Sequence, residues 1–182
     1  MTTIMLETAR LVLKKFSLAD APGFYELNLD PEVLRYTGDT SFSSVAEAEA
    51  FIRGYTHYER YGYGRWSVFI KETGEYAGFC GLNNRPELDE VDVGFRLLRR
   101  YWGKGYTTEA ARGSIEYGFE AFGLERIVAR AMRENRASIR VIEKLNMHFE
   151  KEFFENGAIW VQYETRKEAA DGCILHRLSG ST

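Results

Sequence analysis

The segment Arg100 to Gly105 has the composition of a phosphate-binding loop. It carries two glycines and two cations, and a helical pattern begins directly after it at about Tyr106. The first N–H groups of a helix have no intrahelical partner, and they carry the positive end of the helix dipole. Glycine lacks the Cβ atom that would hold an anion away from the backbone. The segment therefore predicts an anion site at a helix start, with an ordinary turn as the plainer alternative.

Other glycine motifs for nucleotides fit this loop less well. The dinucleotide pattern G-x-G-x-x-G fails, because Thr108 stands where its third glycine belongs. The pattern G-x-x-x-x-G-K-[ST] for ATP and magnesium is absent from the sequence. A nucleotide-binding regulator is thus a weak alternative, which stabilisation by ATP but not by coenzyme A would support.

The composition excludes several classes of protein. With 182 residues, 45% hydrophobic and 28% charged, the chain suits one globular domain over residues 1–182. Residues 168–182 are expected to form an extra C-terminal strand or a tail. A net charge of -3 argues against a general nucleic-acid or membrane surface. No signal peptide or long apolar run is evident, so we expect a cytoplasmic protein.

The cysteines and histidines suggest no metal centre. Cys80 and Cys173 are too few for a disulfide framework or a zinc site, and free thiols are expected. The three histidines, His57, His148 and His176, show no ligand spacing. We therefore expect chemistry that needs no metal.

Strand and helix patterns alternate along the chain. Strands are predicted at Arg10–Phe16, Trp66–Lys71, Glu75–Leu82, Val91–Leu97, Arg126–Met132, Met147–Phe154, Ile159–Arg166 and Cys173–Leu178. Helices are predicted at Ser17–Leu29, Pro31–Tyr36, Ser44 to about Tyr61, Tyr106–Phe122 and Asn135–Leu145, and a loop at Asn83–Glu90. The alternation predicts an α/β fold, and hairpin turns at Thr73-Gly74 and Asn156-Gly157 predict a mixed sheet.

The glycine loop and its flanks resemble a known family. The run Val91-Asp-Val-Gly-Phe-Arg-Leu97, followed by Arg100-Tyr-Trp-Gly-Lys-Gly-Tyr-Thr-Thr-Glu-Ala110, resembles the central motif of the GNAT superfamily of N-acetyltransferases, in its RimJ/RimL-like branch. Further similar segments are Leu6–Leu13, Asp30–Tyr36, Asn135–Ser138 and Glu143–Met147, so the resemblance covers about Leu6 to Glu150. It implies a mixed, splayed β-sheet flanked by helices on both faces, which transfers acetyl from acetyl-CoA to an amine.

The resemblance also implies where the acetyl-CoA cosubstrate binds. The loop would hold the coenzyme A pyrophosphate through Arg100, Trp102, Gly103, Lys104, Gly105, Tyr106 and Thr107. Backbone groups of Phe95 and Leu97 would bind the pantetheine arm and the acetyl carbonyl. That arm would enter the gap where this strand separates from Arg126–Met132. Asn135 would bond the arm as well, and a plain helix N-cap is compatible with that role.

The catalytic assignments implied by the resemblance are less complete. The attacking amine must be neutral, which at pH 7 costs about 4.6 kcal/mol for a lysine amine and about 1 kcal/mol for an α-amino group. Asp92 is the predicted base, and a solvated strand residue is the alternative. Ile142 stands where many relatives carry a tyrosine, so the predicted donor to the thiolate is Ser138, which matches a serine of the RimJ/RimL-like branch. A helix-surface serine with no role is the alternative. Glu109 also matches a family position, and we expect it to be structural.

The sequence does not identify the acceptor or all the residues that bind it. A set of aromatic side chains is expected near the acceptor, some of them as core residues: Tyr36, Tyr55, Tyr58, Tyr61, Tyr63 and Trp66. The acceptor would be a protein N-terminal α-amino group or a small-molecule amine. Alternatives are another acyl donor, a hydroxyl, polyamine or drug acceptor, or a non-catalytic acyl-CoA-binding module. A free strand edge at Cys173–Leu178 would allow a homodimer.

Overall fold

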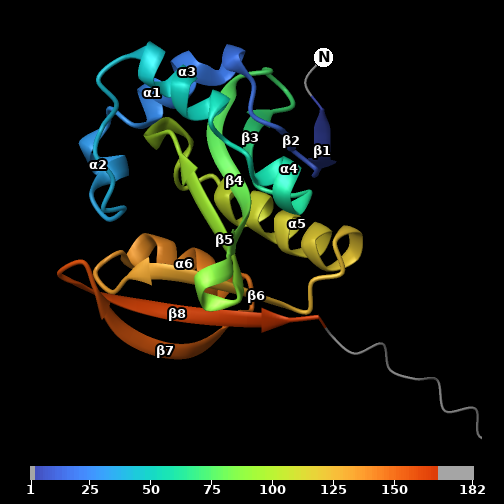
Figure 1. Cartoon of the computed structure of the whole chain (residues 1–182), viewed down its shortest axis with the longest axis vertical. Helices are drawn as coiled ribbons and strands as arrows, with labels where there is room; N and C mark the ends of the chain where they lie inside the picture. Colours follow the sequence, from blue (N-terminus) through green and yellow to red (C-terminus); the bar gives the residue numbers. More distant parts are fainter. Residues whose placement is uncertain (1–2, 168–182) are drawn as a thin grey trace, which may run out of the picture.

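The structure, a computed structural model, describes residues 3–167. These residues form one eight-stranded sheet in the order β1-β2-β3-β4-β5-β6-β8-β7, shown in Figure 1. The predicted strand Cys173–Leu178 lies outside the described residues. The extent of the domain over residues 1–182 therefore stays a prediction.

The sheet is mixed, as the hairpin signals predicted. Its strands are β1 (Ile4–Glu7), β2 (Leu11–Lys14), β3 (Arg65–Ile70), β4 (Tyr76–Arg85), β5 (Glu90–Leu97), β6 (Arg126–Met132), β7 (His148–Glu155) and β8 (Ala158–Arg166). All neighbours run antiparallel except β5 and β6, which are parallel. The turn Asn156-Gly157 has positive φ at both residues, as the predicted hairpin between β7 and β8 requires.

The helices are short except for one. The α-helices are α1 (Ala21–Leu27), α2 (Pro31–Leu34), α3 (Val45–Arg53), α4 (His57–Tyr61), α5 (Tyr106–Ala121) and α6 (Arg136–Lys144). Three 3₁₀ turns are η1 (Leu18–Asp20), η2 (Pro86–Leu88) and η3 (Arg99–Tyr101). Two predicted caps are confirmed, because the side chains of Ser44 and Asn135 accept backbone N–H groups at the starts of α3 and α6.

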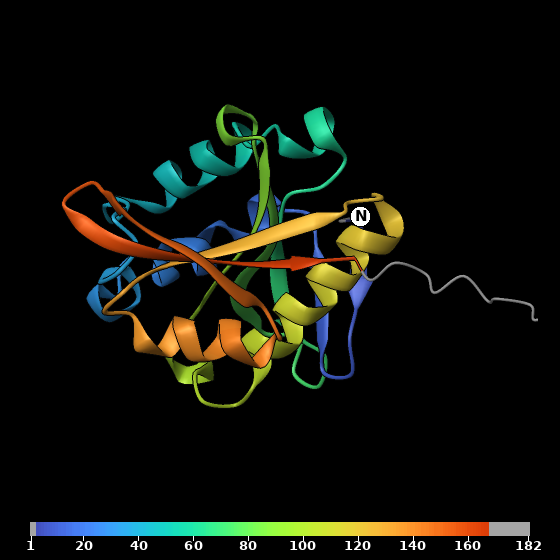
Figure 2. The ribbon, with the colours of Figure 1, turned by 90° about the horizontal axis from the view of Figure 1, so that it is seen from below.

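Helices cover both faces of the sheet, as expected. Alternate side chains of β4 point to opposite layers: Cys80 contacts Ser114 of α5 at 3.6 Å, whereas Phe79 packs on Phe24 of α1 with ring centroids 5.6 Å apart. Burial raises the pKa of the Cys80 thiol to about 11, so this cysteine is a core residue. Figure 2 shows α5 on one side of the β4–β5 ribbons and α3 on the other.

Three elements differ from the sequence prediction. β1 was not predicted, and β4 continues to Arg85 through the expected loop. The helix predicted from Ser44 to about Tyr61 ends at Arg53 as α3, and α4 follows separately. The extension of β4 follows from its pairing, because Asn83 to Arg85 lie opposite Asp92 to Glu90. The break between α3 and α4 allows two tyrosines to reach β3: Tyr55 accepts from the Arg65 N–H at 2.7 Å, and Tyr58 donates to the Arg65 carbonyl.

Candidate functional site

The strands β5 and β6 separate along their length. Their only registered pair in the described sheet is Asp92 with Val128, near the start of both strands. Beyond this pair the two ribbons diverge toward their C-terminal ends, as Figure 1 shows. The predicted splay between Val91–Leu97 and Arg126–Met132 is therefore confirmed.

The backbone of β5 offers hydrogen-bonding groups to this gap. The Leu98 N–H donates to the Ala77 carbonyl at 2.9 Å, so Leu98 bonds toward β4. Because backbone groups alternate in direction along a strand, those of Phe95 and Leu97 face the opposite side, toward β6. An incoming extended chain with amide groups could pair with them as a strand would.

The glycine loop lies at the wide end of the gap. After η3, Trp102 is extended, Gly103 and Gly105 have φ of 71° and 79°, and α5 begins at Tyr106. The two left-handed residues require glycine or a comparably tolerant side chain. The Trp102 indole N–H donates to the Leu97 carbonyl at 2.8 Å, which ties the loop to the end of β5. The geometry is that of an anion-binding helix start.

The two loop cations have different surroundings. Arg100 bonds Glu26 of α1 at 2.5 Å, and this hydrogen bond is the main cause that raises the pKa of Arg100 above its usual value. Lys104 is exposed and lies over the Tyr101 ring at 5.6 Å. Within residues 3–167 Lys104 forms no salt bridge, in contrast to Arg100 with Glu26. The Arg100 charge is partly balanced before any ligand arrives.

Asn135 and Ser138 stand at the start of α6, where β6 ends. The Asn135 Oδ1 atom accepts from the Ser138 N–H at 3.1 Å, which leaves the Asn135 side-chain NH₂ free to donate elsewhere. The Ser138 hydroxyl makes no hydrogen bond within the described residues. Ile142, one turn later, is only 1% exposed and belongs to the core. The position of the expected tyrosine therefore faces inward and holds a side chain that cannot donate.

Asp92 differs from the solvated strand residue considered as its alternative. It is 8% exposed, and its Oδ1 atom pairs with Arg65 Nη2 at 2.5 Å. Gly94 makes room for this arginine, because a Cβ atom there would collide with the Arg65 guanidinium. Asp92 is thus a buried, ion-paired carboxylate at the point where β5 and β6 part. Arg65 was not identified from the sequence, where it is an ordinary strand residue.

Most of the predicted acceptor aromatics serve other purposes. Trp66 is fully buried, Tyr63 is 7% exposed, and the Tyr55 and Tyr58 hydroxyls bond the backbone of Arg65. Burial raises the pKa of Tyr58 well above its usual value, although the Phe16 N–H opposes this shift. Trp66 packs against Tyr117 of α5, whereas Tyr55 packs against Phe16 and Tyr58. Tyr36 and Tyr61 are the two members of the predicted set that are neither buried nor bonded to the Arg65 backbone, and both are half-buried.

A charged cluster closes the narrow end of the gap. Glu90 of β5 bonds Arg130 of β6 at 2.8 Å, Gln162 of β8 at 2.9 Å and Arg126 of β6 at 3.3 Å. Burial tends to raise the pKa of Glu90, but these hydrogen bonds and the Arg130 charge outweigh it and lower the pKa. The cluster joins the two halves of the sheet where their backbone pairing is sparse.

Replacing Glu90 by glutamine should therefore destabilise the fold by about 1–3 kcal/mol at pH 7. Because the folded pKa lies below the unfolded value near 4.5, the stabilisation is complete above pH 4.5 and is lost as pH falls through the folded pKa. Between pH 7 and pH 3 the melting temperature should depend less on pH in Glu90→Gln than in the wild type. Glu152→Gln, in an exposed pair with Arg133, is the matched control. Equal melting temperatures for Glu90→Gln and wild type at pH 7 would contradict this role.

Two other features of residues 3–167 bear on the kind of site. No helix in this range is long and apolar enough to cross a membrane. The same residues bring together no group of three or more histidine, cysteine, aspartate or glutamate side chains suited to a metal ion.

Comparison with known proteins identifies the family. The acetyltransferase (GNAT) domain model matches residues 10–148. Uncharacterized N-acetyltransferase p20 from Bacillus licheniformis is 38% identical over 149 residues, 81% of this chain and 83% of that protein. FsC-acetyl coenzyme A-N(2)-transacetylase from Aspergillus fumigatus is 28% identical over 162 residues, 82% and 67% of the two chains. RimL, an alpha-N-protein acetyltransferase solved with coenzyme A, shares the fold with a TM-score of 0.74 at 17% identity, covering 90% of this chain and 98% of RimL. The fold and motifs agree with these matches, and the chain belongs to the GNAT family of acetyltransferases.

Proposed function

We propose that this protein transfers the acetyl group of acetyl-CoA to a primary amine by direct attack in a ternary complex. The observation that carries the proposal is the gap between β5 and β6, where β5 has no registered β6 partner beyond Asp92 and leads to the glycine loop at the start of α5. The pantetheine arm contains amides that can pair with Phe95 and Leu97. The pyrophosphate matches the N–H groups and the charge of the loop from Arg100 to Thr107.

The reaction removes one proton from the amine and leaves a thiolate that needs a hydrogen-bond donor. The neutral amine attacks the thioester carbonyl, the C–S bond breaks, and the coenzyme A thiolate leaves. Asp92, at the narrow end of the gap, accepts the amine proton directly or through a water. Ser138, at the start of α6, donates a hydrogen bond to the thiolate, and Asn135 donates its side-chain NH₂ to the pantetheine arm. These roles are supported by the position of each residue beside the gap.

Two classes of acceptor fit this reaction. RimL supports a protein N-terminal α-amino group, and the N(2)-transacetylase supports a small-molecule amine. An α-amino group is neutral at pH 7 at a cost of about 1 kcal/mol, whereas a lysine amine needs about 4.6 kcal/mol. Asp92 therefore contributes more to the rate when the acceptor is the more basic lysine amine. A polyamine or drug amine, or a longer acyl donor, remains the alternative within the same chemistry.

Thiol release from acetyl-CoA across a panel of amines tests the function. The panel includes a peptide with a free N-terminus, the same peptide blocked at Nα but carrying lysine, an amino acid and a polyamine. We expect release above background with at least one class, and the best acceptor defines the substrate. Coenzyme A binding with no release for any amine would instead favour the non-catalytic acyl-CoA-binding module.

Replacing Ser138 by alanine should lower kcat about tenfold, because the thiolate loses one hydrogen-bond donor. The helix start should persist, since the Asn135 cap uses the Ser138 backbone N–H and not its hydroxyl. The affinity for coenzyme A should stay within twofold of the wild type. Turnover with the best amine and calorimetry with coenzyme A measure the two effects. An unchanged kcat would remove Ser138 from the mechanism.

A further inference from the structure

The turn between β1 and β2 contacts the glycine loop and the first turn of α5. Arg10 lies in this turn, and its guanidinium Nη1 donates to the Lys104 carbonyl at 2.9 Å. The same guanidinium lies over the Tyr106 ring at 4.5 Å. A Cβ atom added at Gly105 would be 3.3 Å from Arg10 Nη2. One side chain thus contacts Lys104 and Tyr106 and lies close to the Gly105 backbone between them.

The bond to the Lys104 carbonyl fixes one peptide plane. The described chain contains no cis peptide, so the C=O of Lys104 and the N–H of Gly105 point in opposite directions. Because Arg10 holds the carbonyl on its own side, the Gly105 N–H is turned away from Arg10. The positive φ of Gly105, 79°, is compatible with this orientation. The bond therefore presents a backbone donor at the start of α5.

Glu109 holds Arg10 in place, and Thr8 in turn bonds Glu109. Glu109 accepts from Arg10 Nε at 2.7 Å, from the Arg10 backbone N–H at 2.8 Å and from the Thr8 hydroxyl at 2.6 Å. Burial tends to raise the pKa of Glu109, but the hydrogen bonds from Thr8 and Arg10 outweigh it and lower the pKa. Glu109 is therefore ionised at neutral pH, and Arg10 balances its charge close to the loop.

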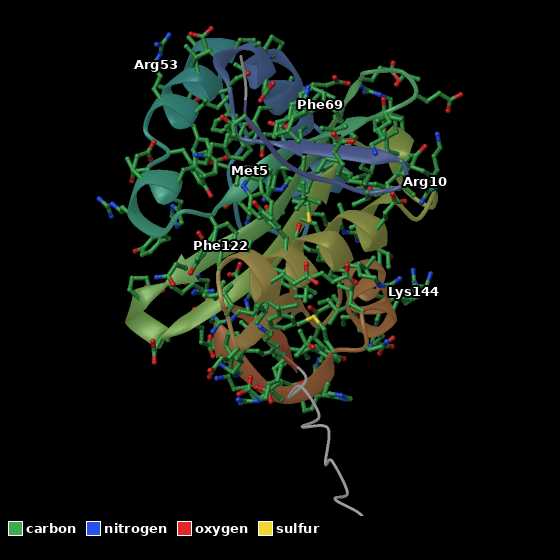
Figure 3. The ribbon with its side chains drawn as sticks, turned by 90° about the vertical axis from the view of Figure 1, so that its right-hand side faces the viewer. Met5, Arg10, Arg53, Phe69, Phe122 and Lys144 are labelled. Atoms are coloured by element: carbon green, nitrogen blue, oxygen red, sulfur yellow. The ribbon has the colours of Figure 1, made fainter. Side chains whose placement is uncertain are left out.

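The contacts lie on the side of α5 that faces the β1–β2 turn. Arg10, Gly105 and Glu109 line a groove of about 730 Å³, which continues along α5 toward Lys144. Figure 3 shows Arg10 and Lys144 on the same side of the molecule. This groove is separate from the gap between β5 and β6. Arg10 thus acts on the loop from behind.

We propose that Arg10 is a positioning residue for the donor site: held by Glu109, which Thr8 bonds in turn, it orients the Lys104–Gly105 peptide so that the Gly105 N–H faces the coenzyme A pyrophosphate. The inference rests on the proposed function of the loop. It adds a residue that supports the loop from the side of the β1–β2 turn. The ion pair between Arg10 and Glu109 thus affects coenzyme A binding through the orientation of the loop peptide.

Arg10→Gln should weaken coenzyme A binding roughly tenfold, because it removes the charged donor that fixes the Lys104 carbonyl. Calorimetry with coenzyme A measures the affinity. The ¹⁵N–¹H signal of Gly105 reports the orientation, and its change on adding coenzyme A should shrink in the variant. Arg10→Lys should recover only part of the affinity, because an ammonium cannot bond the Lys104 carbonyl and Glu109 in the same fork. Arg112→Gln is the matched control, since Arg112 lines the same groove but bonds the Lys144 carbonyl at 2.7 Å.

The outcomes separate this inference from the proposed function. Absence of coenzyme A binding in the wild type would refute the donor site itself. Wild-type binding together with Arg10→Gln within twofold, or full recovery in Arg10→Lys, would overturn the role of Arg10 alone. If Arg10→Gln does not fold, Thr8→Val and Glu109→Gln loosen Arg10 more mildly, and each should weaken binding in the same direction. Unchanged affinity in both would equally overturn it.

Discussion

Replacing Asp92 by asparagine should lower kcat about 100-fold, the usual size of a general-base effect. Asparagine keeps the shape of aspartate and an oxygen that can still accept from Arg65, but it cannot take a proton from the amine. The affinity for acetyl-CoA should stay within twofold, because Asp92 lies at the narrow end of the gap and the loop lies at the wide end. Steady-state turnover with the best amine and calorimetry with coenzyme A measure the two quantities.

Two further variants distinguish the loss of a general base at Asp92 from the loss of its ion pair. Asp39→Asn makes the same substitution in another arginine-paired aspartate on the sheet face of Asp92, and it should change kcat by less than about threefold. Asp92→Glu retains a carboxylate and should keep more activity than Asp92→Asn. If Asp92→Asn turns over within twofold of the wild type, Asp92 is not the base, and its ion pair with Arg65 is purely structural.

The second large effect concerns the charge of the loop. Gly103 has φ of 71°, and an added Cβ atom would meet nothing within 4 Å. Asparagine and aspartate both tolerate this backbone conformation, and they differ in charge but little in shape. Gly103→Asp should therefore weaken acetyl-CoA binding about 30-fold through repulsion of the pyrophosphate, whereas Gly103→Asn should weaken it only a few fold.

Salt provides an independent check of this prediction. The difference between Gly103→Asp and Gly103→Asn should shrink as ionic strength rises, because the loop is exposed and its charges are screened. Calorimetry at two salt concentrations measures the difference. Equal affinities for the two variants at low salt would show that no anion of the ligand lies near Gly103.

Much of the local structure of the candidate donor site was predictable from the sequence, because it depends on neighbouring residues. The glycine loop, the start of α5 and the Asn135 cap each depend on residues within a few positions of one another, and the structure has all three. The separation of β5 from β6 was predicted from the family resemblance. A pattern of alternating residues contains no information on where two strands stop pairing.

The features that the sequence did not predict depend on contacts between segments that are distant in the chain. Arg65 reaches Asp92 because β3, β4 and β5 align Arg65 with Gly81 and Gly81 with Gly94, a register that no local pattern specifies. The break between Arg53 and His57 has the same origin, since the bonds from Tyr55 and Tyr58 to Arg65 compete with a continuous helix. The turn at Arg10 was also missed, because its partner Glu109 is remote in sequence.

A crystal structure with bound coenzyme A would locate the ligand. We expect the pantetheine arm between β5 and β6, bonded to the backbone of Phe95 and Leu97, with the pyrophosphate on the N–H groups from Trp102 to Thr107. We also expect the Lys104 carbonyl to stay bonded to Arg10. Coenzyme A bound outside the gap, for example in the groove behind α5, would refute the proposed donor site.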